Sequence, residues 1–146
     1  MNIALVIAGL VVVLDQLTKY AVVQLLPYLN SRPVIPGVFY LTHVRNVGAA
    51  FGLFAEQRIL FMVAVVFITA AFFFFRSELR RLGTIALVAS GLVLGGALGN
   101  AIDRVRLGYV VDFFDFKVWP VFNVADSAIV VGSLLLAFCV IRADGK

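Results

Sequence analysis

The stretch LGTIALVASGLVLGGALGNAI, residues 82–102, decides the fold class, because it carries no charged side chain. At about 1.5 Å of rise per residue, a helix of this length crosses a hydrocarbon core roughly 30 Å thick. Three further apolar blocks lie at residues 3–26, 59–75 and 121–141. The block 59–75 is the shortest, but it is uncharged and rich in Phe. We therefore predict an all-α integral membrane protein built as a bundle of four transmembrane helices.

Composition supports this class. Hydrophobic residues make up 63% of the 146 positions and charged residues 14%, and the apolar positions form long blocks. The remainder is too short for a second domain, so we expect a single membrane domain over residues 1–146. The first block is read as a retained span, because it lacks a basic leader and contains Asp15 and Lys19. Basic residues at membrane boundaries account for the net charge of +4, so no nucleic-acid partner is expected.

Basic residues near the span ends predict the orientation. The connector RSELRR, residues 76–81, holds three arginines, and the C-terminal segment adds Arg142 and Lys146. The excess of positive charge on cytoplasmic loops predicts that both termini are cytoplasmic. With four spans, the C-terminal ends of the first and third spans and the N-terminal end of the fourth then lie at the outer face.

Those three ends hold almost every polar group inside the spans. The polar residues are Asp15, Gln16, Lys19, Gln24, Asn100, Asp103, Arg104, Asn123, Asp126 and Ser127. Polar groups within membrane spans are costly and usually functional. Their gathering in one leaflet predicts a site near the outer surface.

Helical spacing indicates which of these side chains share a face. Asn100, Asp103 and Arg104 stand at i, i+3 and i+4, and Asp15 and Lys19 form an i,i+4 pair of opposite charge. Either pattern allows its members to face the bundle interior. For Asp15 and Lys19, a structural ion pair and a role beside the site remain equal alternatives.

Two aspartates point to chemistry. Asp112 lies in the segment VVDFF and Asp126 in FNVADS, and both belong to the outer end of the bundle. Two carboxylates that approach each other at the edge of hydrocarbon suggest a shared proton. Asp115 is a rival for the role of Asp112. Asn123 or Asp126 could also serve as the N-cap of the last helix.

The connector between the first two spans is the one sizeable extramembrane piece. Prolines and a glycine punctuate residues 33–37, and residues 38–44 are typical of a short strand, which predicts a small extracytoplasmic β-sheet between helices one and two. The small residues of the segment 46–52 would let backbone approach a peptide or a lipid headgroup. His43 has no second ligand at metal-binding spacing, so no metal is expected. Cys139 is the only cysteine and can form no intramolecular disulfide.

Five motifs in chain order resemble the bacterial lipoprotein signal peptidases, also called type II signal peptidases. They are Asp15-x-x-x-Lys19, Asn46-x-Gly48-Ala-Ala-Phe51, Gly96-Ala-Leu-Gly-Asn100-Ala-Ile-Asp103-Arg104, Val-Val-Asp112-Phe and Phe-Asn123-Val-Ala-Asp126-Ser. The resemblance covers nearly the whole chain. It implies an aspartic endopeptidase of the bacterial inner membrane, with no cofactor, that removes the signal peptide from prolipoproteins just before a diacylglyceryl-modified cysteine. Membrane lipids and the inhibitor globomycin are the other implied partners.

The resemblance also implies roles for residues. Asp112 and Asp126 match the catalytic pair of the family, which favours Asp112 over Asp115. The residues expected to bind substrate or support the site are Asn46, Gly48, Asn100, Arg104, Asn123, Asp15 and Lys19. In this chemistry one carboxyl group stays protonated while the other, as a base, activates water.

Two other classes of function fit the residues alone. Ser127 and Lys19 could form a serine–lysine hydrolase, which needs no carboxylate pair. A small transporter or lipid-binding protein could use Asp15, Lys19 and Asp126 as a proton or substrate relay.

Overall fold

The computed structural model describes residues 2–48 and 58–144. In chain order the elements are α1 (Asn2–Leu25), β1 (Ser31–Ile35), β2 (Phe39–Asn46), α2 (Arg58–Phe74), α3 (Arg76–Arg81), α4 (Thr84–Arg106), β3 (Val110–Asp115) and α5 (Val124–Asp144). The expectation of a largely helical membrane protein with a small sheet is confirmed.

Within the described residues, three helices are long and apolar enough to cross a membrane. They are α1, α4 and the segment Val124–Ala143 of α5, so the chain is a multi-pass membrane protein. The apolar part of α2, Ile59–Phe74, is shorter. The count of four spans therefore stays a prediction.

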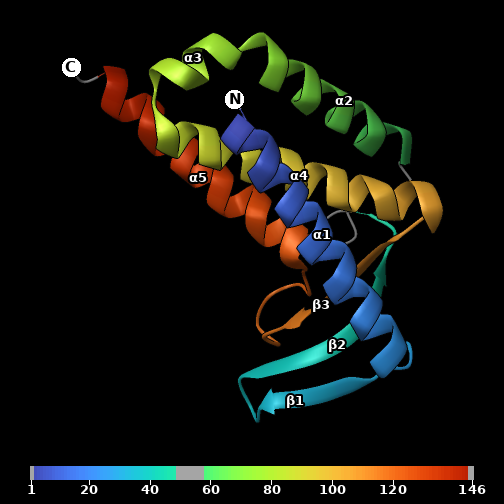
Figure 1. Cartoon of the computed structure of the whole chain (residues 1–146). Helices are drawn as coiled ribbons and strands as arrows, with labels where there is room; N and C mark the ends of the chain where they lie inside the picture. Colours follow the sequence, from blue (N-terminus) through green and yellow to red (C-terminus); the bar gives the residue numbers. More distant parts are fainter. Residues whose placement is uncertain (1, 49–57, 145–146) are drawn as a thin grey trace.

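Helix α4 is the centre of the bundle. It packs along α1 and α5 and also contacts α2 (Figure 1). Small residues make this close approach possible: a Cβ atom added at Gly95 would lie 2.7 Å from the backbone oxygen of Ala8 in α1. Membrane helices that approach this closely are held by van der Waals contact between backbones. Gly91, Gly96 and Gly99 of α4 are in similarly close contact with α1 or α5, so the glycines of this helix serve packing.

The sheet is antiparallel, with strand order β1-β2-β3. The strand expected at residues 38–44 is the central strand, β2. The expectation that the sheet lies between helices one and two is incomplete, because β3 comes from the connector between α4 and α5. This strand pairs Asp112 with Val44 of β2. It is buried along almost its whole length, so its sequence is a short apolar run without alternation, and periodicity could not identify it as a strand.

The two ends of the bundle differ in character. The sheet lies at one end, where α1 and α4 finish and α5 begins, while α3, the start of α1 and the end of α5 lie at the other (Figure 1). Towards that second end the core is a cluster of apolar side chains that includes Ala8, Phe72 and Leu94. The polar residues of the spans are therefore gathered at the sheet end. Successive spans run in opposite directions across the membrane, so the end of α1, the end of α4 and the start of α5 lie on the same side.

Candidate active site

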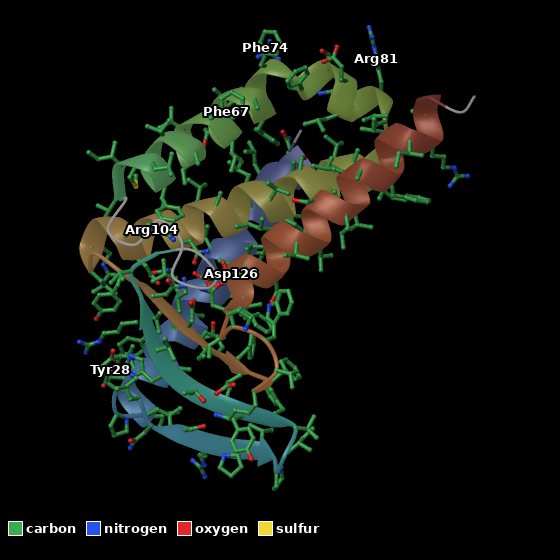
Figure 2. All side chains as sticks on the ribbon, turned by 180° about the vertical axis from the view of Figure 1, so that it is seen from behind. Tyr28, Phe67, Phe74, Arg81, Arg104 and Asp126 are labelled. Carbon is green, nitrogen blue, oxygen red and sulfur yellow. The ribbon has the colours of Figure 1, made fainter. Side chains whose placement is uncertain are left out.

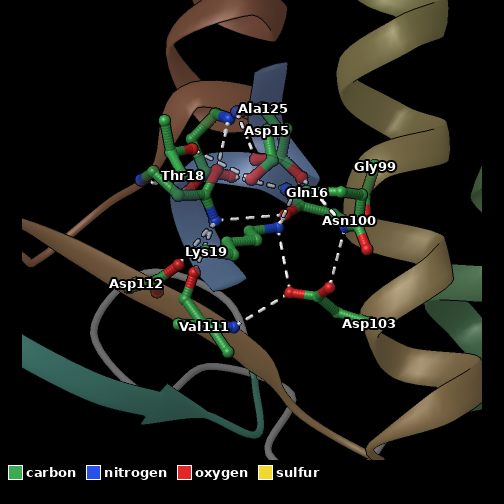
Figure 3. Close-up of polar contacts among 12 residues, drawn as sticks. Asp15, Gln16, Thr18, Lys19, Gly99, Asn100, Asp103, Val111, Asp112 and Ala125 are labelled. Atoms are coloured by element: carbon green, nitrogen blue, oxygen red, sulfur yellow. Dashed lines mark hydrogen bonds and ion pairs between the residues drawn. The ribbon is translucent and has the colours of Figure 1, made fainter. Parts of the chain in front are cut away.

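The polar end of the bundle is organised around the ammonium group of Lys19. This side chain is only 3% exposed. Its Nζ lies 2.8 Å from Asp15 Oδ2 and 2.9 Å from Asp103 Oδ2, and donates a hydrogen bond of 3.0 Å to Asn100 Oδ1 (Figure 3). A lysine ammonium has three hydrogen atoms to donate, and all three have an acceptor here. The predicted pairing of Asp15 with Lys19 is confirmed, but a second carboxylate, from α4, completes it.

The carboxylates of Asp15 and Asp103 also accept hydrogen bonds from backbone N–H groups that lie next to the candidate catalytic aspartates. Asp15 Oδ1 accepts a hydrogen bond of 3.0 Å from the backbone nitrogen of Ala125. Asp103 Oδ2 accepts one of 3.1 Å from the backbone nitrogen of Val111. Each anchored residue directly precedes one of the two aspartates, Asp126 or Asp112. The Lys19 cluster, defined as Lys19, Asp15 and Asp103, therefore positions both.

Asp103 and Gln16 belong to the polar network but were absent from the expected site residues. Gln16 Nε2 donates a hydrogen bond of 3.0 Å to Asp103 Oδ1. The i+3 spacing of Asp103 from Asn100 was a signal for its position, because it places both on one face of α4. Its contact with Lys19 of α1 depends on the packing of two helices, which spacing within one helix cannot reveal.

Asn100 connects the Lys19 cluster to Asp126. Its Oδ1 accepts hydrogen bonds from Lys19 and, at 3.1 Å, from Asn123 Nδ2. The amide oxygen must face these donors, so the NH₂ group faces Asp126 and donates to its Oδ1 at 2.7 Å. The orientation of this amide is thus fixed by a buried positive charge.

Asn123 caps α5 and also joins the two aspartates. Its Oδ1 accepts a hydrogen bond of 2.8 Å from the backbone nitrogen of Asp126, and Asp126 Oδ2 accepts one of 3.2 Å from the backbone nitrogen of Asn123. This reciprocal arrangement is a capping box. The side-chain Nδ2 of Asn123 donates to Asp112 Oδ1 at 2.6 Å. Sequence reasoning offered capping as an alternative to function, and Asn123 combines the cap with a contact to each aspartate.

Asp112 projects from β3 and is 1% exposed. Its Oδ2 accepts a hydrogen bond of 2.8 Å from Asn46 Nδ2. The Oδ1 of Asn46 accepts one of 3.0 Å from the backbone nitrogen of Gly48, which fixes the amide with its NH₂ group towards the carboxylate. The remaining residues of the expected motif, 49–52, lie outside the described residues.

Arg104 lies with Asp126 between the helices and the sheet (Figure 2). Its guanidinium donates to the backbone oxygen of Gly48 at 3.2 Å and lies 4.0 Å from the centre of the Phe61 ring. This placement ties α4 to the segment after β2 and to α2.

Asp112 and Asp126 face one cavity of about 380 Å³. Most of its lining is apolar, and the polar residues that line it are Asn46, Asn100, Arg104, Asp112 and Asp126. Such a cavity can take a peptide with apolar neighbours and present two carboxyl groups to it.

The comparisons with known proteins agree with this geometry. The family model described as Signal peptidase (SPase) II matches residues 7–142. The chain belongs to the signal peptidase II family. It is 45% identical over 131 residues to a lipoprotein signal peptidase of Halothermothrix orenii, covering 90% of each chain, and 49% identical over 145 residues to one of Syntrophotalea carbinolica, covering 93% of this chain and 90% of that one.

Solved structures show the same fold. A bacterial membrane enzyme determined by the in meso method at 2.3 Å resolution matches with a TM-score of 0.90 and 34% identity, covering 97% of this chain and 89% of that one. A second, determined at 1.9 Å, matches with a TM-score of 0.82 and 33% identity, covering 97% and 94%. The resemblance to lipoprotein signal peptidases is confirmed.

In this signal peptidase II chain, the two carboxyl groups of β3 differ in their surroundings. Burial raises the pKa of Asp112 to about 7, and the nearby carboxylate of Asp126 adds to the rise. Hydrogen bonds from Asn46 and Asn123 favour the ionised form but offset only part of this effect. Asp112 can therefore exchange a proton near neutral pH.

Asp115 does not compete for the same position. It lies an odd number of residues from Asp112 in the strand and so points to the other face of the sheet. Its Oδ2 is 2.6 Å from Lys117 Nζ and accepts a hydrogen bond of 2.5 Å from Thr42 Oγ1. Burial acts to raise the pKa of Asp115, but the hydrogen bonds from Lys117 and Thr42 outweigh it, and the pKa lies below its usual value. Asp115 is buried in β3, so it is not a group at a solvated turn.

Other candidate groups lie elsewhere or have other partners. Ser127 Oγ donates to the backbone oxygen of Asn123 at 2.9 Å, so it is engaged with its own helix and not with Lys19. His43 is buried and its ring bonds the backbone oxygen of Leu26 at 2.9 Å, away from the cavity. Among the described residues, no group of three His, Cys, Asp or Glu side chains is placed to hold a metal.

The Lys19 cluster leads to a prediction about stability. One ammonium faces two carboxylates, so removing the ammonium leaves two buried charges without a partner, whereas removing one carboxylate leaves a neutral pair. We expect Lys19→Gln to lower the free energy of unfolding by about 3–5 kcal/mol and Asp103→Asn to lower it much less. Unfolding in detergent measures both.

The double variant K19Q/D103N supplies the control. It should be more stable than Lys19→Gln alone, because one uncompensated carboxylate is removed. Losses that simply add would contradict ion pairing within the cluster.

Proposed function

We propose that this chain is an aspartic endopeptidase that removes the signal peptide from diacylglyceryl-modified prolipoproteins, cutting immediately before the lipidated cysteine. The observation that carries the proposal is that Asp112 and Asp126 face one largely apolar cavity and are both bonded to Asn123. The lipoprotein signal peptidases that the chain resembles supply the substrate class.

The contacts of the two aspartates suit a shared proton. Their described hydrogen-bond donors are N–H groups of amides, from Asn46, Asn100 and Asn123. Neutral donors hold a carboxylate in place but stabilise its charge less than a cation does. The pair can therefore keep one proton near neutral pH, which is the state that aspartic proteases use.

Hydrolysis follows from that state. The ionised carboxylate takes a proton from a water molecule as the water oxygen attacks the scissile carbonyl carbon, and the protonated carboxyl group donates a hydrogen bond to the carbonyl oxygen. When the tetrahedral intermediate collapses, the carbon–nitrogen bond breaks and a proton passes to the cysteine nitrogen. The products are the free carboxylate of the signal peptide and a new amino terminus on the lipidated cysteine.

The surroundings of the cavity fit an apolar substrate. Phe61, Val65 and Ile129 are among its lining residues. Ile68 lines this cavity and also a second, apolar hollow of about 240 Å³ between α2, α4 and α5. We infer that the signal helix and the lipid chains follow these apolar surfaces, while Arg104 holds the backbone at Gly48 beside the scissile bond.

The membrane arrangement completes the proposal. We infer a single peptidase domain over residues 1–146 in the bacterial inner membrane, with α2 as the fourth span and both termini cytoplasmic. The arginines of α3 and Arg142 lie at the end of the bundle that carries both chain termini, and they favour this orientation. The sheet and the cavity then lie at the outer face.

The first experiment tests the aspartate pair. Asp112→Asn and Asp126→Asn should each abolish cleavage of a lipidated precursor by purified protein, because asparagine keeps the shape but cannot exchange the proton. Asp115→Asn is the matched control, since it changes the same group in the same strand, and it should keep its activity. Substantial cleavage by either of the first two variants would remove that residue from the mechanism.

The second experiment tests the substrate. A diacylglyceryl group anchors the residue after the scissile bond by burying its chains, at about 0.8 kcal/mol per methylene. We expect rapid cleavage of the lipid-modified precursor and little or no cleavage of the same precursor without the lipid, as seen by a gel shift. Globomycin should block the reaction. Equal cleavage of both precursors would exclude anchoring by lipid, and cleavage of neither would favour a transporter.

The third experiment uses pH. The pair must keep one proton, so kcat/KM should fall as the pH rises through the pKa of Asp112, about 7. Asn46→Ala removes a hydrogen bond that favours the ionised form, so it should raise this pKa and move the fall in kcat/KM to higher pH. A fall that stays at the same pH would show that Asn46 does not act on the proton of the pair.

A further inference from the structure

A second concave surface lies at the end of the bundle opposite the sheet. It is a hollow of about 440 Å³ between the end of α3, the start of α4 and the end of α5. Its lining residues are Arg81, Leu82, Thr84, Ile85, Phe138, Cys139, Arg142 and Ala143. We call it the terminal hollow. It contains none of the residues of the candidate active site.

The lining residues of the terminal hollow include two arginines and no acidic residue. Arg81 and Arg142 are both exposed, and Arg81 lies at the end of α3 with its side chain directed outward from the bundle (Figure 2). Among the side chains that the structure describes, neither guanidinium forms an ion pair within 4.0 Å. The carboxylate of Glu78 in α3 accepts a hydrogen bond of 2.7 Å from Ser77 and also interacts with the charge of Arg81, but it is exposed and lies outside the lining. Because the lining itself holds no acidic side chain, an external anion can approach both arginines there.

The rest of the lining is apolar. Ile85 and Phe138 are each 54% exposed, and they lie in the first turns of α4 and the last turns of α5. The ends of membrane helices lie at the level where lipid headgroups meet acyl chains. A ligand at this place therefore meets cations on its polar side and hydrocarbon surface on the other.

We propose that the terminal hollow binds an anionic glycerophospholipid, with its phosphodiester at Arg81 and Arg142 and an acyl chain along Ile85 and Phe138. Guanidinium groups bind phosphate oxygens through paired hydrogen bonds, and basic pockets between membrane helices favour anionic headgroups. A zwitterionic lipid would bring a cation close to the arginines. A second copy of this chain would bring the same arginines, so like charges disfavour it.

Native mass spectrometry of the full chain in detergent tests the proposal. With added dioleoylphosphatidylglycerol, the wild-type protein should retain this lipid in preference to dioleoylphosphatidylcholine. A basic residue near an anionic lipid contributes a few-fold in affinity, so R81Q or R142Q should weaken binding about fivefold and R81Q/R142Q about thirtyfold. R81K/R142K keeps the charge and should retain most of the binding.

Two matched controls separate the terminal hollow from general charge effects. R76Q/R80Q removes two charges from α3 outside the lining, and R32Q/R106Q removes two exposed charges at the other end of the molecule. R32Q/R106Q should bind phosphatidylglycerol within about twofold of wild type, since charges beyond a Debye length of about 10 Å are screened. R76Q/R80Q removes charges that are close to Arg81 but outside the lining, so it should weaken binding clearly less than R81Q/R142Q, because no direct hydrogen bond to the phosphate is lost. Weakening by R76Q/R80Q equal to that of R81Q/R142Q would overturn the proposal in favour of a diffuse basic surface.

Further outcomes are also decisive. Equal retention of the two lipids by the wild type, or no loss in R81Q/R142Q, would overturn the proposal. sn-Glycerol 3-phosphate carries the phosphate without acyl chains, so it should compete poorly with the lipid. Effective competition by it would assign the hollow to a soluble phosphate. A thermal unfolding curve for each variant shows that any loss of binding comes from the hollow and not from misfolding.

Discussion

The ammonium of Lys19 is the constraint on which the polar end depends. A charge buried this deeply must be compensated, and Asp15 and Asp103 do so from α1 and α4. Each carboxylate also holds the backbone nitrogen that precedes a candidate catalytic aspartate, in β3 or in α5. The Lys19 cluster thus fixes β3 and the start of α5 relative to each other, although these segments belong to different elements. Asn100, held by the same ammonium, adds a direct contact to Asp126.

Asp112 and Asp115 show how surroundings decide the behaviour of like groups in one strand. Asp115 faces Lys117 at 2.6 Å, and its pKa lies below the usual value, so it stays ionised. Asp112 is bonded to the neutral amides of Asn46 and Asn123, and burial beside Asp126 raises its pKa to about 7. A cation in contact with Asp112 would stabilise the carboxylate and remove the exchangeable proton. The amides of Asn46 and Asn123 hold the carboxylate of Asp112 in place without removing its exchangeable proton, because they are neutral.

The sequence predicted the outline of this site through two kinds of pattern. Apolar blocks located the helices, and spacing within a helix placed Asn100 and Asp103 on one face and paired Asp15 with Lys19. The contacts between elements could not be predicted in this way. The pairing of β3 with β2, and the approach of Asp103 to Lys19, arise from tertiary packing. The last apolar block was placed at residues 121–141, and a helix that began at 121 would put Asp126 five residues inside it. The side chain of Asn123 caps the helix instead, so α5 begins at Val124 and Asp126 lies in its first turn.

The division of the molecule into a polar and an apolar end follows from the membrane itself. Hydrocarbon stabilises the helices only where they are apolar, so the polar contacts that hold the two aspartates gather at one boundary. A hydrolytic reaction requires water and proton exchange, and both are available at that boundary. The apolar lining of the cavity, with Phe61 and Ile129, continues the hydrocarbon environment up to the carboxyl groups. A substrate can therefore keep its apolar parts in lipid while one peptide bond reaches the polar end, and this geometry would be lost if the Lys19 cluster lay deeper in the bundle.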